Sequence, residues 1–172
     1  MKIINLEEID STQKYLKNID IDDSVIAFCE KQTSAYGQYN RVWYTSNDSL
    51  AFSYKYNSKK LIKVDEESIK KITLNFSKLI NDYFNVESYL KLPNDIYLNQ
   101  KKLCGILIET KYFNHKITSI IIGIGLNINN EMFPVEIKDI ATSIYLETNK
   151  KYDINDFKDY LCTYFEDQII KE

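Results

Sequence analysis

Glycine is scarce in this 172-residue chain, which contains four of them and a single arginine among its 22 basic residues. The glycines, the arginine and the only tryptophan stand at Gly37, Gly105, Gly123, Gly125, Arg41 and Trp43. Glycine is favoured where the backbone takes a positive φ or where another group must approach the main chain closely. A guanidinium is a planar fork that suits phosphate or carboxylate. We therefore expect an anion-binding loop near residues 35–43, completed by glycine-bearing strands within residues 102–125.

Alternating strand and helix patterns must position these residues. The pattern predicts strands over residues 2–7, 24–31, 49–56 (half-buried), 86–92, 95–99, 102–112 and 116–126, with a tight turn at Asn99-Gln100. It predicts helices from Ser11-Thr12 to about residue 18, from residue 65 to about 83, and from Ile154 with Phe157, Leu161, Tyr164, Phe165 and Gln168 on one side. The fold class is α+β, a mixed and largely antiparallel sheet covered by helices.

Residue counts exclude several common chemistries. The only histidine, His115, falls in a predicted hairpin turn, so a histidine-based zinc site cannot be built. The chain has no C-x-x-C, G-x-S-x-G or G-x-x-x-x-G-K-[ST] sequence, which argues against hydrolases and P-loop NTPases.

Composition also bounds the partners and the compartment. A net charge of −3 argues against a nucleic-acid-binding surface. No run reaches the roughly 18 apolar residues of a membrane helix, and the first residues carry acids where a signal peptide needs a continuous apolar run, so we expect neither. The three cysteines are far apart and are expected to be buried free thiols. We expect a cytoplasmic protein with no DNA partner and no membrane partner.

Five segments resemble, in order, the motifs of the biotin protein ligases. Residues 10–13 (D-S-T-Q) resemble D-S-T-N, and residues 32–43 resemble Q-x-x-G-R-G-R-x-G-R-x-W. Residues 91–95 (K-L-P-N-D) resemble K-W-P-N-D, and residues 102–109 (K-L-C-G-I-L-I-E) resemble K-L-x-G-I-L-x-E. Residues 123–127 (G-I-G-L-N) resemble G-x-G-x-N. An ordered series is far more specific than any one of its motifs.

A shorter segment, residues 141–144 (A-T-S-I), extends the resemblance, which covers about residues 5–146. It implies a class II synthetase-like catalytic domain of the biotin and lipoate ligase type over residues 1–172. The implied activity is that of a ligase that forms biotinyl-5′-AMP from biotin and ATP and then biotinylates a lysine of a biotin carboxyl carrier protein domain. The implied cofactors are ATP and Mg²⁺. A homodimer is possible, and the sequence does not decide the oligomeric state.

The resemblance also implies roles for single residues. Among the catalytic residues, Lys102 lies between the biotin carboxylate and the α-phosphate, Arg41 contacts phosphate, and Asp95 orients or deprotonates the acceptor lysine. Cations suit this step because it brings two anions together. Asp95 and Asn94 would be Mg²⁺ ligands. The biotin-binding residues are Ser11, Thr12, Gln32, Ala35, Tyr36, Lys102, Gly105, Gly123 and Gly125. The ATP-binding residues are Gln38, Arg41, Trp43, Asn94, Asp95, Lys102 and Asn127.

Several of these residues have a purely structural alternative. Ser11 and Thr12 are also good helix caps, and Asp95 is an ordinary turn residue. The structural alternative for Lys102 is a surface hairpin lysine, for Arg41 a surface ion pair, and for Trp43 a core aromatic.

Three features depart from the family pattern. We expect neither an N-terminal helix-turn-helix nor a C-terminal SH3-like domain, hence no repressor activity. The loop of residues 35–41 lacks two arginines and two glycines, with Tyr36 and Gln38 in the arginine positions.

Two alternative functions stay open beside a biotin protein ligase. One is a lipoate or octanoate ligase or transferase, whose R-R-x-S-G-G-G run is missing, and the other is a non-catalytic biotin- or adenylate-binding module.

Overall fold

The structure is a computed structural model that describes residues 1–21, 23–56, 64–114 and 116–165, without the side chains of residues 116 and 164. Its chain divides into two compact units. The first unit comprises residues 1–65 and 106–125, and the second comprises residues 66–105 and 126–172. His115 and Gln168, and the side chain of Tyr164, lie outside the described part.

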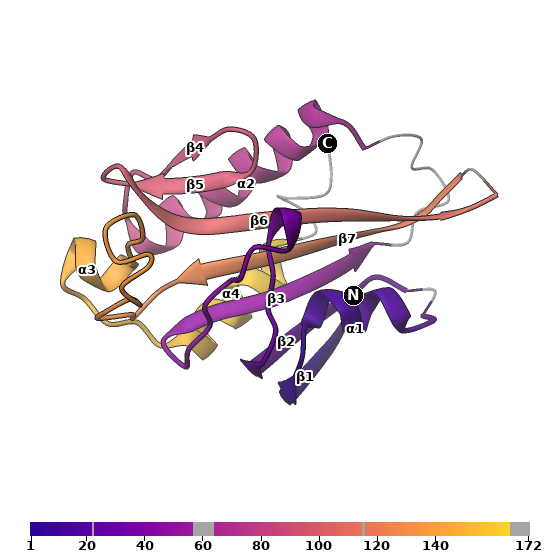
Figure 1. The fold of residues 1–172 in the computed structure, drawn as a ribbon, viewed down its shortest axis with the longest axis horizontal. Coiled ribbons are helices and arrows are strands. Elements are labelled where there is room, and N and C mark those ends of the chain that lie inside the picture. Colours follow the sequence, from indigo (N-terminus) through magenta and orange to yellow (C-terminus); the bar gives the residue numbers. More distant parts are fainter. Residues whose placement is uncertain (22, 57–63, 115, 166–172) are drawn as a thin grey trace. The chain divides into compact units, whose positions relative to one another are not determined.

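The first unit is built on a parallel strand pair joined by a helix. Its elements are β1 (Lys2–Ile9), α1 (Thr12–Asn18), β2 (Val25–Gln32), a 3₁₀ turn η1 (Gln38–Asn40) and β3 (Ser49–Tyr56), together with most of β6 (Lys101–Phe113) and of β7 (Lys116–Asn127). Strands β1 and β2 are parallel, whereas β2 and β3 are antiparallel, and α1 contacts β2 and β3 (Figure 1). A core of Leu16, Val25, Ala27 and Ile121 holds α1 on the strands.

Strand β3 is buried on both faces, so the expectation of a half-buried strand was wrong. Leu50, Phe52 and Tyr54 alternate as predicted, at 0–2% exposure, yet Ser53 and Lys55 between them are also buried. The reason is that α1 covers the second face. The Lys55 ammonium donates to the backbone oxygen of Ile19, the residue that ends α1, at 2.7 Å. Such a contact satisfies a terminal helix carbonyl.

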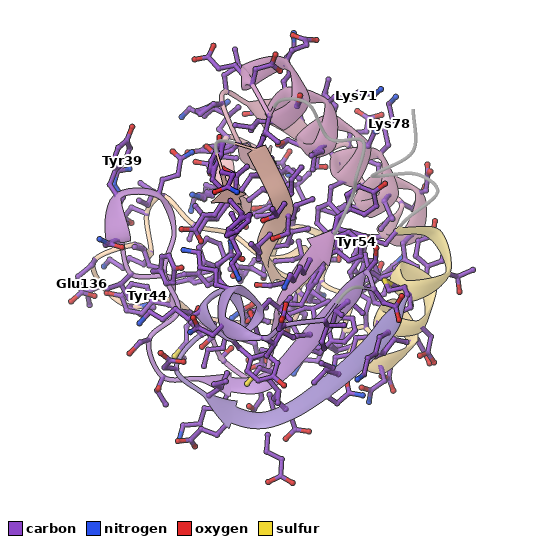
Figure 2. All side chains as sticks on the ribbon, turned by 90° about the vertical axis from the view of Figure 1, so that its right-hand side faces the viewer. Tyr39, Tyr44, Tyr54, Lys71, Lys78 and Glu136 are labelled. Atoms are coloured by element: carbon purple, nitrogen blue, oxygen red, sulfur yellow. The ribbon has the colours of Figure 1, made fainter. Side chains whose placement is uncertain are left out.

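The second unit packs two helices through aromatic rings. Its elements are α2 (Glu66–Phe84), β4 (Tyr89–Lys91), β5 (Asp95–Leu98), the start of β6 (Lys101–Phe113), the end of β7 (Lys116–Asn127), α3 (Ile144–Thr148) and α4 (Ile154–Phe165). The Phe76 ring on α2 meets Phe165 on α4, and Phe84 meets Phe157 at 4.8 Å between centroids. Lys71 and Lys78, both labelled in Figure 2, are exposed residues of α2.

The strands form one seven-stranded sheet in the order β1-β2-β3-β7-β6-β5-β4. Since β1 and β2 are parallel while β4, β5 and β6 pair antiparallel, the predicted mixed α+β sheet is confirmed. The turn at Asn99-Gln100 is confirmed as well, because both residues take positive φ angles, 46° and 70°. The sequence analysis did not predict α3, which has only five residues.

Three further expectations can be compared with the described residues. All four glycines are described and none takes a positive φ, so the positive-φ explanation of their placement was wrong. All three cysteines are free thiols as predicted, although Cys104 alone is fully buried. Among the described helices, none combines the length and the apolar character that a membrane crossing requires.

Candidate active site

A buried hydrogen-bond network in the first unit joins two of the predicted biotin-binding residues. The amide of Thr12 donates to Gln32 Oε1 at 2.8 Å, and the Thr12 hydroxyl lies 2.9 Å from Ser53 Oγ. Ser53 donates to Gln13 Oε1 at 3.0 Å, and Gln13 Nε2 donates to the backbone oxygen of Ile121. We call Thr12, Gln13, Gln32 and Ser53 the Thr12 network. It presents several donors and acceptors at one place on an otherwise apolar core.

The sequence left two roles open for both Ser11 and Thr12, helix capping and biotin binding. In the structure the two side chains make different contacts. The Ser11 side chain accepts from the Lys14 amide at 3.5 Å and is the N-cap of α1, while the Ser11 amide donates to Asp10. The Thr12 side chain instead belongs to the Thr12 network. Helix capping therefore accounts for Ser11 and leaves the Thr12 side chain unexplained by local structure.

Side chains of the same unit approach Gly123 and Gly125 closely. A Cβ at Gly123 would lie 2.6 Å from Gln13 Oε1, and one at Gly125 would lie 2.3 Å from the Trp43 indole. Close approach is thus the physical reason for glycine at both positions. Sequence reasoning did not assign Gln13 or Ser53 to the site, although a serine inside the apolar alternation of β3 was a usable signal.

The loop that carries Arg41 is closed by backbone hydrogen bonds at its base. The Trp43 amide donates to the Ala35 oxygen at 3.0 Å, and the Gly37 amide donates to the Arg41 oxygen at 2.8 Å. At the tip, Asn40 takes a left-handed φ of 56°. Asparagine tolerates that conformation better than most residues, so it replaces the glycine expected in this part of the loop without loss of the turn.

Two predicted ATP-binding residues, Gln38 and Arg41, lie at the tip of that loop. Gln38 begins η1, and Arg41 follows it with an exposed side chain. The Arg41 guanidinium lies 5.8 Å from the Tyr39 ring centroid. Figure 2 shows Tyr39 pointing away from the ribbon, in agreement with its 85% exposure. The tip therefore presents its cation to solvent.

Tyr36 anchors the loop to an ion pair, which the sequence did not predict. The Lys17 ammonium lies 2.5 Å from Glu109 Oε1 and 3.4 Å from the Tyr36 hydroxyl, which in turn donates to Glu109 Oε2 at 3.1 Å. We call these three residues the Tyr36 cluster. They come from α1, the loop and β6, so the cluster ties three separate segments together.

Protonation stabilises the Tyr36 cluster at neutral pH. Burial and the Glu109 carboxylate raise the pKa of Tyr36. Burial lowers the pKa of Lys17, but the hydrogen bond and charge of Glu109 outweigh burial and leave that pKa raised. A raised pKa in the folded state means that the contribution to stability is complete below the unfolded-state pKa and is lost as pH rises through the folded value. The contributions of Tyr36 and Lys17 to the cluster should therefore be complete at neutral pH and be lost only in the alkaline range.

We expect Tyr36→Phe to loosen the loop without unfolding the protein. The change removes only the hydroxyl, and a hydrogen bond contributes about 0.5–1.5 kcal/mol, so the amides of residues 37–43 should exchange roughly two- to tenfold faster. Hydrogen exchange of the ligand-free protein measures this. Tyr39→Phe is the matched control, since the Tyr39 ring is exposed, and it should change nothing. Equal protection in Tyr36→Phe and wild type would contradict an anchoring role.

In the second unit, Lys102 and Asp95 form an ion pair, with Lys102 Nζ 2.8 Å from Asp95 Oδ1. Asp95 begins β5 and stands opposite Gly105 in the register of β5 with β6. The preceding residue, Asn94, is buried. The structure therefore brings together four residues predicted from two separate motifs.

Backbone hydrogen bonds fix the place of Lys102. Its amide donates to the Ile140 oxygen at 2.8 Å, and its oxygen accepts from the Thr142 amide at 2.9 Å. Asn127 Nδ2 donates to the Thr142 oxygen at 3.0 Å. The segment of residues 140–142, which we call the Lys102 strap, thus connects Lys102 to the predicted residue Asn127. Neighbouring Cys104 is not a nucleophile, because burial strongly raises the pKa of its thiol.

The profile of the biotin/lipoate A/B protein ligase family matches residues 6–127. The chain belongs to this family. The match contains the whole Thr12 network, the Arg41 loop, the Tyr36 cluster and the Lys102–Asp95 pair. The Lys102 strap lies beyond its end.

Individual members of the biotin/lipoate A/B protein ligase family resemble the chain over most of its length. It is 31% identical over 163 residues to the bifunctional ligase/repressor BirA of Bacillus subtilis, a match that covers 88% of this chain and 48% of that protein. The chain therefore spans about half the length of this curated relative. The biotin protein ligase of Aquifex aeolicus in complex with biotin and ATP matches with a TM-score of 0.80 and 29% identity, over 98% of this chain and 73% of that one.

A second solved structure shows the same fold at lower identity. The biotin protein ligase of Leishmania major in complex with biotin matches with a TM-score of 0.78 and 21% identity, over 96% of this chain and 73% of that one. Within this ligase family fold, Arg41 belongs to the first unit and Lys102 to the second.

Proposed function

We propose that the chain is a biotin protein ligase, which joins biotin to a lysine of a biotin carboxyl carrier domain at the expense of ATP. The observation that supports the proposal is the Lys102–Asp95 pair, because the resemblance assigns both residues to catalysis and the Lys102 strap holds the Lys102 backbone. The similarity to an Aquifex protein that binds biotin and ATP, over 98% of the chain, supports the choice of substrates.

In the first step, a biotin carboxylate oxygen attacks the α-phosphorus of ATP and pyrophosphate leaves. Both reactants are anions, so a fixed cation stabilises the charge that develops in the transition state. Lys102 is our candidate for that cation, because Asp95 and the strap restrict both ends of a side chain that is otherwise flexible. The Thr12 network supplies the polar groups that a ureido ring requires.

In the second step, the acceptor lysine amine attacks the biotinyl carbonyl carbon and AMP leaves with the bonding electron pair. The amine must lose a proton, and we assign its orientation and deprotonation to the Asp95 carboxylate. Mg²⁺ is commonly bound by one or two carboxylates together with substrate phosphates, so Asp95, with Asn94 as a further oxygen donor, fits the ion that ATP brings. The three free thiols agree with a reducing cytoplasm.

The test is a reaction with purified components. The protein is incubated with MgATP, a carrier domain and either biotin, lipoate or octanoate, and pyrophosphate release and carrier mass are measured. The proposal requires a biotin-sized mass gain on the carrier. A lipoyl or octanoyl gain would establish the acyl-ligase alternative, and binding of biotin without any gain would establish a non-catalytic module.

The altered loop leads to a prediction about retention of the adenylate. Tyr36 and Gln38 stand where the family has arginines, and charge-assisted hydrogen bonds to phosphate are about twice as strong as neutral ones. We expect Gln38→Arg to slow dissociation of biotinyl-5′-AMP about tenfold, which corresponds to about 1.4 kcal/mol. Stopped-flow displacement measures this rate, and Gln38→Lys tests whether charge without the fork suffices. An unchanged rate in both variants would show that the missing arginine does not limit retention.

A further inference from the structure

The Glu147 carboxylate accepts one hydrogen bond from a nearby residue, Thr142, and one from Asn99, which is 48 residues away in the sequence. Asn99 Nδ2 donates to Glu147 Oε2 at 2.6 Å, and the Thr142 hydroxyl donates to Glu147 Oε1. Glu147 itself lies on α3, which begins at the cap Ser143. The Ser143 hydroxyl donates to the Asn130 oxygen at 2.6 Å, so the helix that carries the carboxylate is itself tied down.

Both donors are next to Lys102. Asn99 is in the turn that leads into β6, three residues before Lys102, and its positive φ of 46° makes that turn possible. Thr142 belongs to the Lys102 strap, and its amide donates to the Lys102 oxygen at 2.9 Å. The Glu147 carboxylate therefore connects the β5–β6 turn, which precedes Lys102, with the Lys102 strap, which hydrogen-bonds to the Lys102 backbone.

We propose that Glu147 is a positioning residue for Lys102. Its two oxygens hold the β5–β6 turn and the Lys102 strap in one arrangement, and this fixes the backbone from which the Lys102 side chain extends toward Asp95. The proposal rests on the proposed function for its catalytic consequence, since the reaction is what requires Lys102 to be in one place.

The physical reason is the steep dependence of catalysis on geometry. A displacement of about 1 Å at a reacting group can cost a hundredfold in rate. Asp95 fixes the ammonium end of Lys102. The Lys102 backbone is held by the pairing of β6 with β5 at Tyr97 and by the strap, which can act only while it stays in place itself. The hydrogen bonds of Thr142 to Glu147 and of Asn127 to the Thr142 oxygen provide that support.

Three substitutions separate positioning from charge and from folding. Glu147→Ala removes both acceptors. Glu147→Gln keeps a carbonyl oxygen for Asn99 and an amide that can donate to the Thr142 hydroxyl oxygen, so it should restore most of the lost rate. Asn99→Gly removes the hydrogen bond to Glu147 Oε2 without straining the turn, because glycine accepts the positive φ. The matched control is Glu131→Ala, which removes a carboxylate of the same unit that pairs with Lys151 at 2.5 Å.

The first readout is hydrogen exchange of the Lys102 and Thr142 amides in the ligand-free protein. Glu147→Ala should speed their exchange at least about tenfold, and Asn99→Gly should act in the same direction but add nothing in the Glu147→Ala background. Glu131→Ala should leave both amides unchanged. Unaltered protection in Glu147→Ala would overturn the proposal. Unaltered protection refutes the proposal even if the wild-type protein shows no turnover, a result that by itself would count against the proposed function alone.

The second readout is pyrophosphate release with biotin and ATP. Glu147→Ala should lower kcat at least about tenfold and leave the KM for biotin within about twofold, because the Thr12 network is built from residues of the first unit and Glu147 belongs to the second. Glu147→Gln should recover kcat to within about threefold of wild type. Faster amide exchange combined with an unchanged kcat would show that the contacts are merely structural and would overturn the positioning role.

Discussion

Lys102→Ala is expected to slow biotinyl-5′-AMP formation at least about a hundredfold while the protein stays folded. The loss is that of removing one preorganised group that stabilises transition-state charge. The fold should survive, because the contacts of Lys102 with Ile140 and Thr142 are made by its backbone and alanine keeps them. Pyrophosphate release with biotin and ATP measures the rate, and thermal unfolding checks the fold.

Lys101→Ala is the matched control for this substitution. Lys101 is the preceding residue of β6 and is likewise half-buried, but its side chain points to the other face of the strand. It should retain nearly the wild-type rate. Near-normal rates in Lys102→Ala would remove Lys102 from the mechanism, and an equal loss in both variants would show that the effect belongs to the strand rather than to Lys102.

Gly125→Ala is expected to lower the free energy of unfolding by about 1–3 kcal/mol, the usual cost of an overpacked site. The added Cβ would lie 2.3–2.6 Å from three atoms of the Trp43 indole, so either the ring or the strand must move. Trp43 is the only tryptophan, and its fluorescence therefore reports the displacement directly. Urea denaturation followed by this fluorescence and by circular dichroism measures both effects.

Gly37→Ala provides the comparison, since Gly37 has φ −107° and the nearest atom to an added Cβ is the Arg41 oxygen at 3.9 Å. Stability should stay the same or rise by up to about 1 kcal/mol, because alanine restricts the unfolded chain. A Gly125→Ala protein as stable as wild type, with unchanged Trp43 fluorescence, would show that the close approach is relieved at no cost.

The sequence by itself determined the local elements and most of the candidate residues. Helix α1 begins after Ser11 as its capping chemistry predicts, and the turn at Asn99-Gln100 follows from residues that tolerate positive φ. Such features depend on neighbours in the chain, so spacing and residue type suffice to predict them. The ordered motifs predicted Lys102, Asp95, Thr12 and Gln32 as site residues through the resemblance to the biotin protein ligases.

Only the tertiary structure decided which side chains surround those residues. Gln13 and Trp43 occupy the space over two glycines of β7, Tyr36 is held by Lys17 and Glu109, and Glu147 is linked to Asn99. Partners such as Tyr36 and Glu109 are 73 residues apart. Their pairing depends on strand register and on how α1 and the loop pack, and a side-chain pattern of period two or 3.6 carries no information about a contact over such a distance.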